Sequence, residues 1–222
     1  MNCSHDDSTD DYNYKVLIIG NSITKHGICS YWWGDWGMAS SRRDKDYVHI
    51  LQKLLYQRKG KFLTMNVSGD SSWEINLNNY DKSNFNPYLK DDIDLIIIRL
   101  GENVSNDSKT MSHYEYDFIS LIKYIKVKSP NALIMVTGNF WKNDLKDEKQ
   151  KNAALKENCI WVSLSHLDID ENKSTINTQV FGDDGKLHTI IEGGSIANGV
   201  AAHPNDLGMQ RIAETIFQAI PL

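Results

Sequence analysis

Residues 14–22 read YKVLIIGNS and decide the fold. Four consecutive apolar residues that end at a glycine are typical of a short strand buried on both faces of a parallel sheet. Similar runs recur along the chain, separated by polar segments long enough to form helices. The strands expected from these runs are 14–19, 62–67, 95–100, 132–137 and 160–164.

Helices are expected between and after these strands. Residues 46–58 (DYVHILQKLLYQR) carry apolar side chains at helical spacing and are followed by Gly60, a suitable C-terminal stop. The other expected helices are 112–126, 147–157 and 206–220. Strands that alternate with helices imply right-handed crossovers, and therefore a three-layer α/β/α sandwich around a mostly parallel sheet.

Length and composition limit the partners of this chain. Its 222 residues are expected to form one domain over 14–222, preceded by a disordered polar leader over 1–13. The net charge is −5 and there is no long basic stretch, so we expect no nucleic-acid partner. The apolar runs are too short for a transmembrane segment, since a spanning helix needs about 20 residues. The oligomeric state is not predicted.

The three cysteines, Cys3, Cys29 and Cys159, show neither a disulfide framework nor zinc-binding spacing. Cys3 precedes a polar, acidic stretch and resembles the lipidated first residue of a mature bacterial lipoprotein. Two interpretations of the compartment therefore remain open. The chain is either a cell-envelope lipoprotein cut from a longer precursor, or a cytoplasmic protein with a frayed N-terminus.

Four residues of chemical interest lie next to expected strand or helix ends. Ser22 follows the first strand, Gly69 the second and Asn103 the third, whereas His203 precedes the last helix. In an open parallel sheet the site lies outside the carboxyl ends of the strands, so we expect these residues to meet. A serine beside a histidine base can act as a nucleophile, and N–H groups can hold the oxyanion that forms.

The four blocks around these residues resemble the SGNH (GDSL-like) hydrolase family. Asn21 departs from the usual Gly-Asp-Ser of the first block. The resemblance implies a flavodoxin-like sheet and ester hydrolysis without a metal or cofactor. It also implies that Ser22 is the nucleophile, that His203 is the base, and that Ser22, Gly69 and Asn103 form the oxyanion hole.

The last block departs from the family pattern as well. Members commonly carry an aspartate three residues before the histidine, and that position is Val200 here. Some relatives use a Ser–His dyad in which a backbone carbonyl holds the imidazole. Three carboxylates upstream of His203 are alternatives to a dyad, and their spacing favours none of them: Asp183, Asp184 and Glu192.

The segment 31–38 (YWWGDWGM) contains three tryptophans, Trp32, Trp33 and Trp36. Tryptophans often pack in cores, but in a loop after the nucleophile they also make platforms for sugar rings or acyl chains. We expect at least one of the three to contact substrate. The long aperiodic segments 25–45 and 168–202 are expected to form the walls of the substrate site.

The remaining polar residues suggest no second chemistry. The other histidines have no metal-binding spacing, and the chain has no phosphate-binding glycine motif. Glu102, next to Asn103, is either a wall residue of the site or an ion-pair partner of Arg99, and we favour the structural interpretation.

The sequence thus predicts a serine esterase that removes a small acyl group, most plausibly an O-acetyl group from a carbohydrate. The substrate would be a small-molecule or glycan ester. Two alternatives remain: a lipid-ester or thioester hydrolase, and a non-catalytic glycan-binding module on the same fold.

Overall fold

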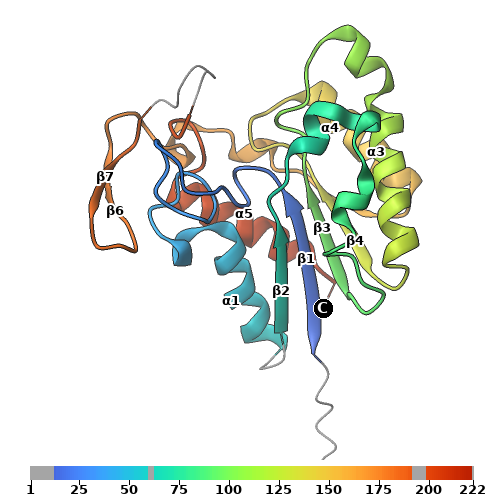
Figure 1. The fold of residues 1–222 in the computed structure, drawn as a ribbon, viewed down its shortest axis with the longest axis horizontal. Coiled ribbons are helices and arrows are strands. Elements are labelled where there is room, and N and C mark those ends of the chain that lie inside the picture. The colour runs from blue at the N-terminus through green and yellow to red at the C-terminus, as the bar shows by residue number, and fades with distance from the viewer. Residues whose placement is uncertain (1–12, 60–62, 192–198, 222) are drawn as a thin grey trace, which may run out of the picture.

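A computed structural model describes residues 13–59, 63–191 and 199–221 of this chain. Five parallel strands form its central sheet, in the order β2-β1-β3-β4-β5 (Figure 1). This order is flavodoxin-like, and the predicted parallel sheet is confirmed. The strands are β1 (Tyr14–Gly20), β2 (Leu63–Ser68), β3 (Leu95–Arg99), β4 (Leu133–Thr137) and β5 (Ile160–Val162).

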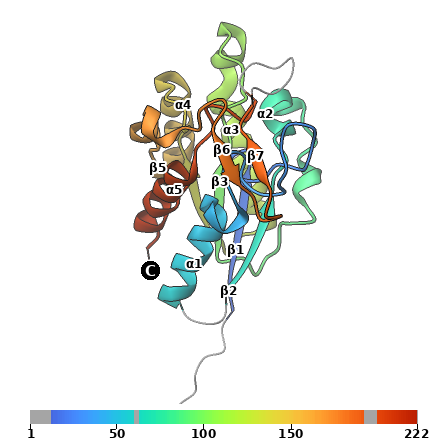
Figure 2. The ribbon, with the colours of Figure 1, turned by 90° about the vertical axis from the view of Figure 1, so that its left-hand side faces the viewer.

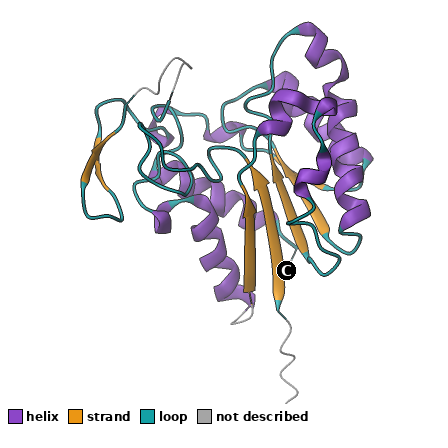
Figure 3. Ribbon diagram, in the orientation of Figure 1, coloured by secondary structure: helices purple, strands orange, loops and turns teal. Residues whose placement is uncertain are grey.

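Helices cover both faces of the sheet, so the predicted three-layer sandwich is also confirmed (Figures 1 and 3). Side chains alternate between the faces along each strand. Leu17 and Ile19 pack toward α2, α3 and α4, whereas Val16 and Ile18 pack toward α1 and α5. The helices are α1 (Tyr47–Lys59), α2 (Ser72–Asn76), α3 (Ser108–Lys128), α4 (Asp144–Lys156) and α5 (Asp206–Ala219).

Three short elements were not expected from the sequence. Helix α2 follows β2, and β6 (Gln179–Phe181) pairs with β7 (Leu187–Thr189) in an antiparallel hairpin. The hairpin lies to one side of the sheet and faces the viewer in Figure 2. Periodicity does not reveal elements of three to five residues, because they span too few turns or alternations.

The two long aperiodic segments pack against each other in a third apolar cluster. Trp32 and Trp36 of the first segment contact Ile190 and Val200 of the second. The expectation that these segments form substrate walls stays a prediction.

The structure bears on the predictions made for the leader, the cysteines and membrane spans only within the described ranges. Most of the leader 1–13, including Cys3, lies outside the described residues. Cys29 is exposed and Cys159 is buried. Within the described ranges, no helix is both long and apolar enough to cross a bilayer.

Candidate active site

Ser22 lies in a tight turn directly after β1. Neighbouring strands lie on both sides of β1, so the chain departs from the sheet at the point where strand order reverses, which is where open α/β sheets place their sites. The backbone N–H groups of Thr24 and Lys25 donate to the carbonyl of Asn21, at 2.9 and 3.0 Å. Gly20 is required here, because a Cβ at this position would lie 1.8 Å from Thr24 Oγ1.

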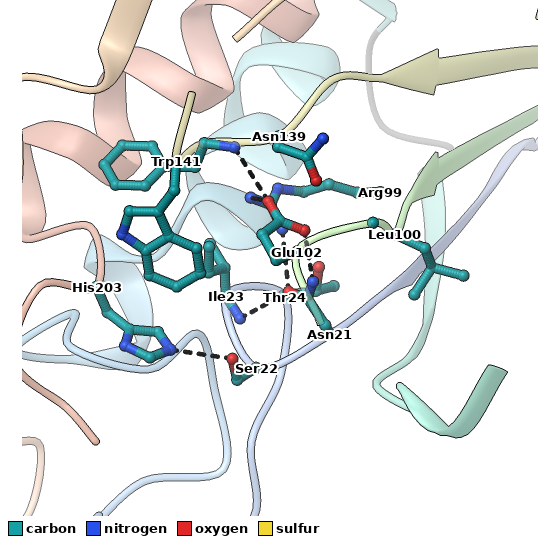
Figure 4. A network of polar contacts seen from close by, with 12 residues as sticks. Asn21, Ser22, Ile23, Thr24, Arg99, Leu100, Glu102, Asn139, Trp141 and His203 are labelled. Atoms are coloured by element: carbon teal, nitrogen blue, oxygen red, sulfur yellow. Dashed lines mark hydrogen bonds and ion pairs between the residues drawn. The ribbon is translucent and has the colours of Figure 1, made fainter. Parts of the chain in front are cut away.

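His203 reaches Ser22 from the other end of the chain. Its Nε2 lies 3.0 Å from Ser22 Oγ, as Figure 4 shows. The histidine is buried, and its backbone is held on two sides: its carbonyl accepts from Ser174 N (2.8 Å), and its N–H donates to Val200 O (3.3 Å). Helix α5 begins three residues later, at Asp206, and the Asn205 side chain caps it by accepting from Gly208 N at 2.9 Å. The fold therefore brings together the serine and the histidine that the sequence singled out.

Burial lowers the pKa of His203 to about 4, because the imidazolium loses hydration. Electrostatic interactions with His26 and Arg99 lower the pKa of His203 further, whereas the backbone carbonyls of Ala201 and Gly199 raise it. The imidazole is consequently neutral at pH 7, the state in which Nε2 can accept a proton.

A tryptophan that sequence analysis missed packs against this imidazole. Trp141 lies edge-to-face on His203, with ring centroids 5.0 Å apart (Figure 4). Its Nε1 donates to Ala202 O at 3.0 Å. Trp141 follows β4, so inspecting the end of the fourth strand, as was done for the first three, would have found it.

No carboxylate among the described residues bonds to His203, and its Nδ1 has no hydrogen-bond partner there. Asp183 accepts from Arg43 N at 3.1 Å, and Asp184 pairs with His188 at 2.9 Å. Neither aspartate therefore orients His203 in this structure. Glu192, the third alternative, lies outside the described residues.

Val200 lies where the family pattern has its aspartate, and its side chain is fully buried among apolar groups. It packs in the third cluster with Trp32 and Ile190. Its carbonyl accepts from Ser174 Oγ at 2.9 Å. Val200 therefore holds the loop through its backbone and offers no carboxylate to His203.

Gly69 and Asn103 lie at the ends of β2 and β3, as expected. A Cβ at Gly69 would approach Lys25 O to 2.9 Å, so glycine permits the two backbones to pass closely. Asn103 is exposed, and its Nδ2 donates to Glu74 Oε2 at 2.6 Å. An amide nitrogen carries two hydrogens, and one remains for another acceptor.

A buried charged network lies beneath the serine turn. Arg99 is completely buried, and its Nη2 donates to Glu102 Oε1 at 2.7 Å, which confirms the ion pair expected from the sequence (Figure 4). Glu102 Oε1 also accepts from Phe140 N at 3.0 Å. A second carboxylate, Glu74, is equally buried. Burial and the charge of Glu102 raise the pKa of Glu74.

Asn21 joins the two carboxylates, which explains why it departs from the usual aspartate. Its Nδ2 donates to Glu102 Oε2 (2.6 Å) and Glu74 Oε1 (3.1 Å). Its Oδ1 accepts from Arg99 Nη1 (3.1 Å) and Ile23 N (3.2 Å). All of its amide hydrogen-bonding capacity is used: the amide donates to two carboxylates and accepts from a guanidinium, whereas an ionised aspartate could only accept.

Two of the three loop tryptophans are structural. Trp32 is 1% exposed and Trp36 is 6% exposed, and both indoles pack in the third apolar cluster. Trp33 is half-buried and stacks on His188, with ring centroids 4.3 Å apart and the rings 8° from parallel. Contact between Trp33 and a substrate stays a prediction. Tertiary packing between the two long segments buries the others, and no local signal shows it.

Comparison with known proteins shows similarity in structure. The sequence matches no protein-family model and no curated protein. A phospholipase A1 from Streptomyces albidoflavus NA297 is 11% identical, with a TM-score of 0.57 and coverage of 94% of this chain and 100% of that one. A protein from Bacteroides ovatus ATCC 8483, assigned as a GDSL-like lipase, is 14% identical, with a TM-score of 0.55 and coverage of 93% and 97%.

A third similar structure is that of a carbohydrate esterase family 2 enzyme with a carbohydrate-binding domain, from Corynascus thermopiles. It is 14% identical, with a TM-score of 0.54, and the match covers 94% of this chain and 65% of that one. These matches extend over nearly all of the present chain.

Proposed function

Because the chain has an SGNH-like hydrolase fold, we propose that it is a serine esterase in which Ser22 is the nucleophile and His203 the general base. The observation that carries this proposal is the 3.0 Å contact between Ser22 Oγ and His203 Nε2, two residues separated by 181 positions in the sequence. A serine becomes a useful nucleophile when a neutral imidazole lies within hydrogen-bond reach of its hydroxyl.

The reaction proceeds in two halves. Ser22 Oγ attacks the ester carbonyl while its proton passes to His203 Nε2, and the resulting oxyanion is held by the N–H groups of Ser22 and Gly69 and by the Asn103 amide. His203 then returns the proton to the departing alcohol. Water attacks the acyl-serine with Nε2 again accepting a proton, and the carboxylic acid leaves as Ser22 is restored.

The base works as part of a dyad in this proposal. With no carboxylate bonded to His203 among the described residues, the carbonyls of Ala201 and Gly199 are the groups that favour its protonated form. Nδ1 has no hydrogen-bond partner among the described residues, so these carbonyls act on the imidazolium through their dipoles and stabilise the cation less than a carboxylate would.

The proposed substrate is a small acyl ester, most plausibly an O-acetyl group on a carbohydrate. Support comes from the carbohydrate esterase family 2 structure, from Trp141, which packs on His203, and from Trp33, a half-buried indole in the long segment that follows Ser22. A lipid ester is the second candidate, because a phospholipase A1 has an equally similar structure.

Reaction with a fluorophosphonate probe tests the proposal. We expect covalent labelling at Ser22, located by peptide mass spectrometry, and none in thermally unfolded protein. Acetate release from acetylated oligosaccharides, compared with turnover of 4-nitrophenyl acetate and 4-nitrophenyl octanoate, then separates the candidate substrates. A folded protein that stays unlabelled and binds glycans without turnover would instead be a glycan-binding module.

The pH dependence of kcat/KM should show one acid limb, with a midpoint near pH 4. Only the neutral imidazole accepts the serine proton, and burial lowers the pKa of His203 to about 4. Activity at pH 5.5 should therefore remain close to the neutral value, whereas a histidine with a pKa of about 6.5 would leave about a tenth of it. An acid limb near pH 6.5 in initial-rate measurements would show that His203 is solvated in the working enzyme.

Replacing Asn103 with alanine should lower kcat by about 10²–10³ and change KM little, because its amide would meet the oxyanion only as charge develops. Steady-state kinetics on 4-nitrophenyl acetate separate the two parameters. If KM rises while kcat is unchanged, Asn103 binds the ground state and is no oxyanion donor.

A further inference from the structure

We propose that Glu74 is a positioning residue for the oxyanion hole, acting through the side-chain amide of Asn103. This inference rests on the proposed function. The juxtaposition that supports it is a buried carboxylate whose two oxygens accept from the backbone and the side chain of the segment that carries Asn103.

The contacts of Glu74 converge on one short segment. Its Oε1 accepts from Gly101 N and, more distantly, from Asn103 N at 3.4 Å. Its Oε2 accepts from Asn103 Nδ2 at 2.6 Å. Helix α2 thus holds the residues that follow β3 through a single carboxylate, which also accepts from Asn21 below the serine turn.

A carboxylate fixes the orientation of the asparagine amide. The two ends of an amide group have nearly the same shape, and rotation by 180° exchanges a donor for an acceptor. If the Asn103 amide rotated, its oxygen would face Glu74 Oε2, and two acceptors would then repel each other. Glu74 therefore keeps the NH₂ group in place, with its second hydrogen available to an oxyanion.

The segment is held from its other side by Lys146 of α4. Lys146 Nζ donates to the carbonyls of Gly101 (3.2 Å) and Glu102 (3.1 Å). Gly101 has a φ of +145°, and a Cβ there would lie 2.6 Å from Asn139 Oδ1, so this backbone has little freedom. An oxyanion donor on a rigid segment needs no reorganisation during the reaction.

A negative charge near a developing oxyanion opposes catalysis by Coulomb repulsion, so its presence has to be balanced. Two cations, Arg99 and Lys146, face the two buried carboxylates, Glu74 and Glu102. The charges of this buried group sum to zero when all four are ionised. Glu74 can then orient Asn103 with its charge balanced within these four side chains, beside a third, half-buried carboxylate, Asp147.

The variant Glu74→Gln tests this role. A glutamine nitrogen placed against the Asn103 amide would set two donors face to face, so we expect the amide to rotate or withdraw. The expected result is a fall in kcat of about tenfold or more with KM changed little. Asp117→Asn is the matched control, because Asp117 is also buried but bonds to His113 on α3. Activity per folded molecule should be unchanged in that control.

A double-mutant cycle separates positioning from general destabilisation. If Glu74 acts through Asn103, Glu74→Gln should change kcat by less than about threefold in the Asn103→Ala background. Rates are normalised to the fraction of protein that reacts with the fluorophosphonate. If the double variant loses kcat by the product of the two single-variant factors, the two residues act independently and the inference is overturned. Should Glu74→Gln not fold, Glu74→Asp carries the same test, since it keeps the charge but withdraws the carboxylate from Asn103.

Failure of the proposed function gives a different result. If wild-type protein shows no turnover that depends on Ser22, the esterase assignment falls and this inference falls with it. If turnover depends on Ser22 and Asn103 while Glu74→Gln leaves kcat unchanged, or lowers it by the same factor with and without Asn103→Ala, only the role of Glu74 is wrong.

Discussion

Replacing Ser22 with alanine is expected to reduce ester turnover by about 10⁴-fold or more while the protein stays folded. The nucleophile is then absent, and only binding and oxyanion stabilisation remain to accelerate the reaction. The fold should tolerate the change, because among the described residues the hydroxyl of Ser22 bonds only to His203 Nε2, and one such bond contributes about 1 kcal/mol.

The measurement is kcat on an acetyl ester, together with the midpoint of thermal unfolding. Ser163→Ala is the matched control, because Ser163 is exposed and its hydroxyl bonds to Ser165 on the surface. It should retain the full wild-type rate. Turnover in Ser22→Ala above about a tenth of that rate would mean that another group is the nucleophile.

The second large effect is expected from Asn21→Asp, which introduces the aspartate usual in the SGNH (GDSL-like) family that the sequence resembles. At neutral pH we expect the free energy of unfolding to fall by about 3–5 kcal/mol, the cost of an uncompensated buried charge. The two hydrogens that Asn21 donates to Glu74 and Glu102 would be replaced by an oxygen, so three carboxylates would meet beside the single guanidinium of Arg99.

The loss should depend on pH in a definite direction. Burial and two neighbouring carboxylates raise the pKa of an aspartate at position 21 above its unfolded value of about 3.9. A group with a raised folded pKa favours the folded state below the unfolded pKa and loses that contribution as pH rises through the folded pKa. The variant should therefore lie closest to wild type near pH 4 and fall further behind toward pH 8.

Urea unfolding at several pH values measures this difference. Asn106→Asp is the matched control, because Asn106 is exposed and its side-chain oxygen accepts from Asn143, a role that a carboxylate keeps. Its stability should stay within about 0.5 kcal/mol of wild type. An Asn21→Asp protein as stable as wild type at pH 8 would contradict the charge balance described for this network.

The strands and long helices could be predicted because the spacing of apolar residues within each element indicates its type. The run at 14–19 became β1, and the spacing of Leu51 and Leu55 marked α1. Ser22, Gly69 and Asn103 could be located because parallel strands end at a common edge, so strand ends along the sequence become neighbours in space.

The site's surroundings could not be predicted in the same way. Glu74 belongs to a five-residue helix that periodicity does not detect, and Trp141 follows a strand end that was not considered. The depressed pKa of His203 depends on burial beneath other segments. Its unperturbed value of about 6.5 was the only one that sequence could supply.

The sequence by itself determined the layered architecture and the residues that meet at the edge of the sheet. Both follow from the spacing of apolar residues along the chain and from the order of strands and helices. The tertiary structure decided which polar groups are charged, which indoles are covered, and why position 21 holds an asparagine. Those outcomes depend on desolvation and on hydrogen bonds between residues as far apart as Asn21 and Glu102, and such energies exist only once distant segments have packed together.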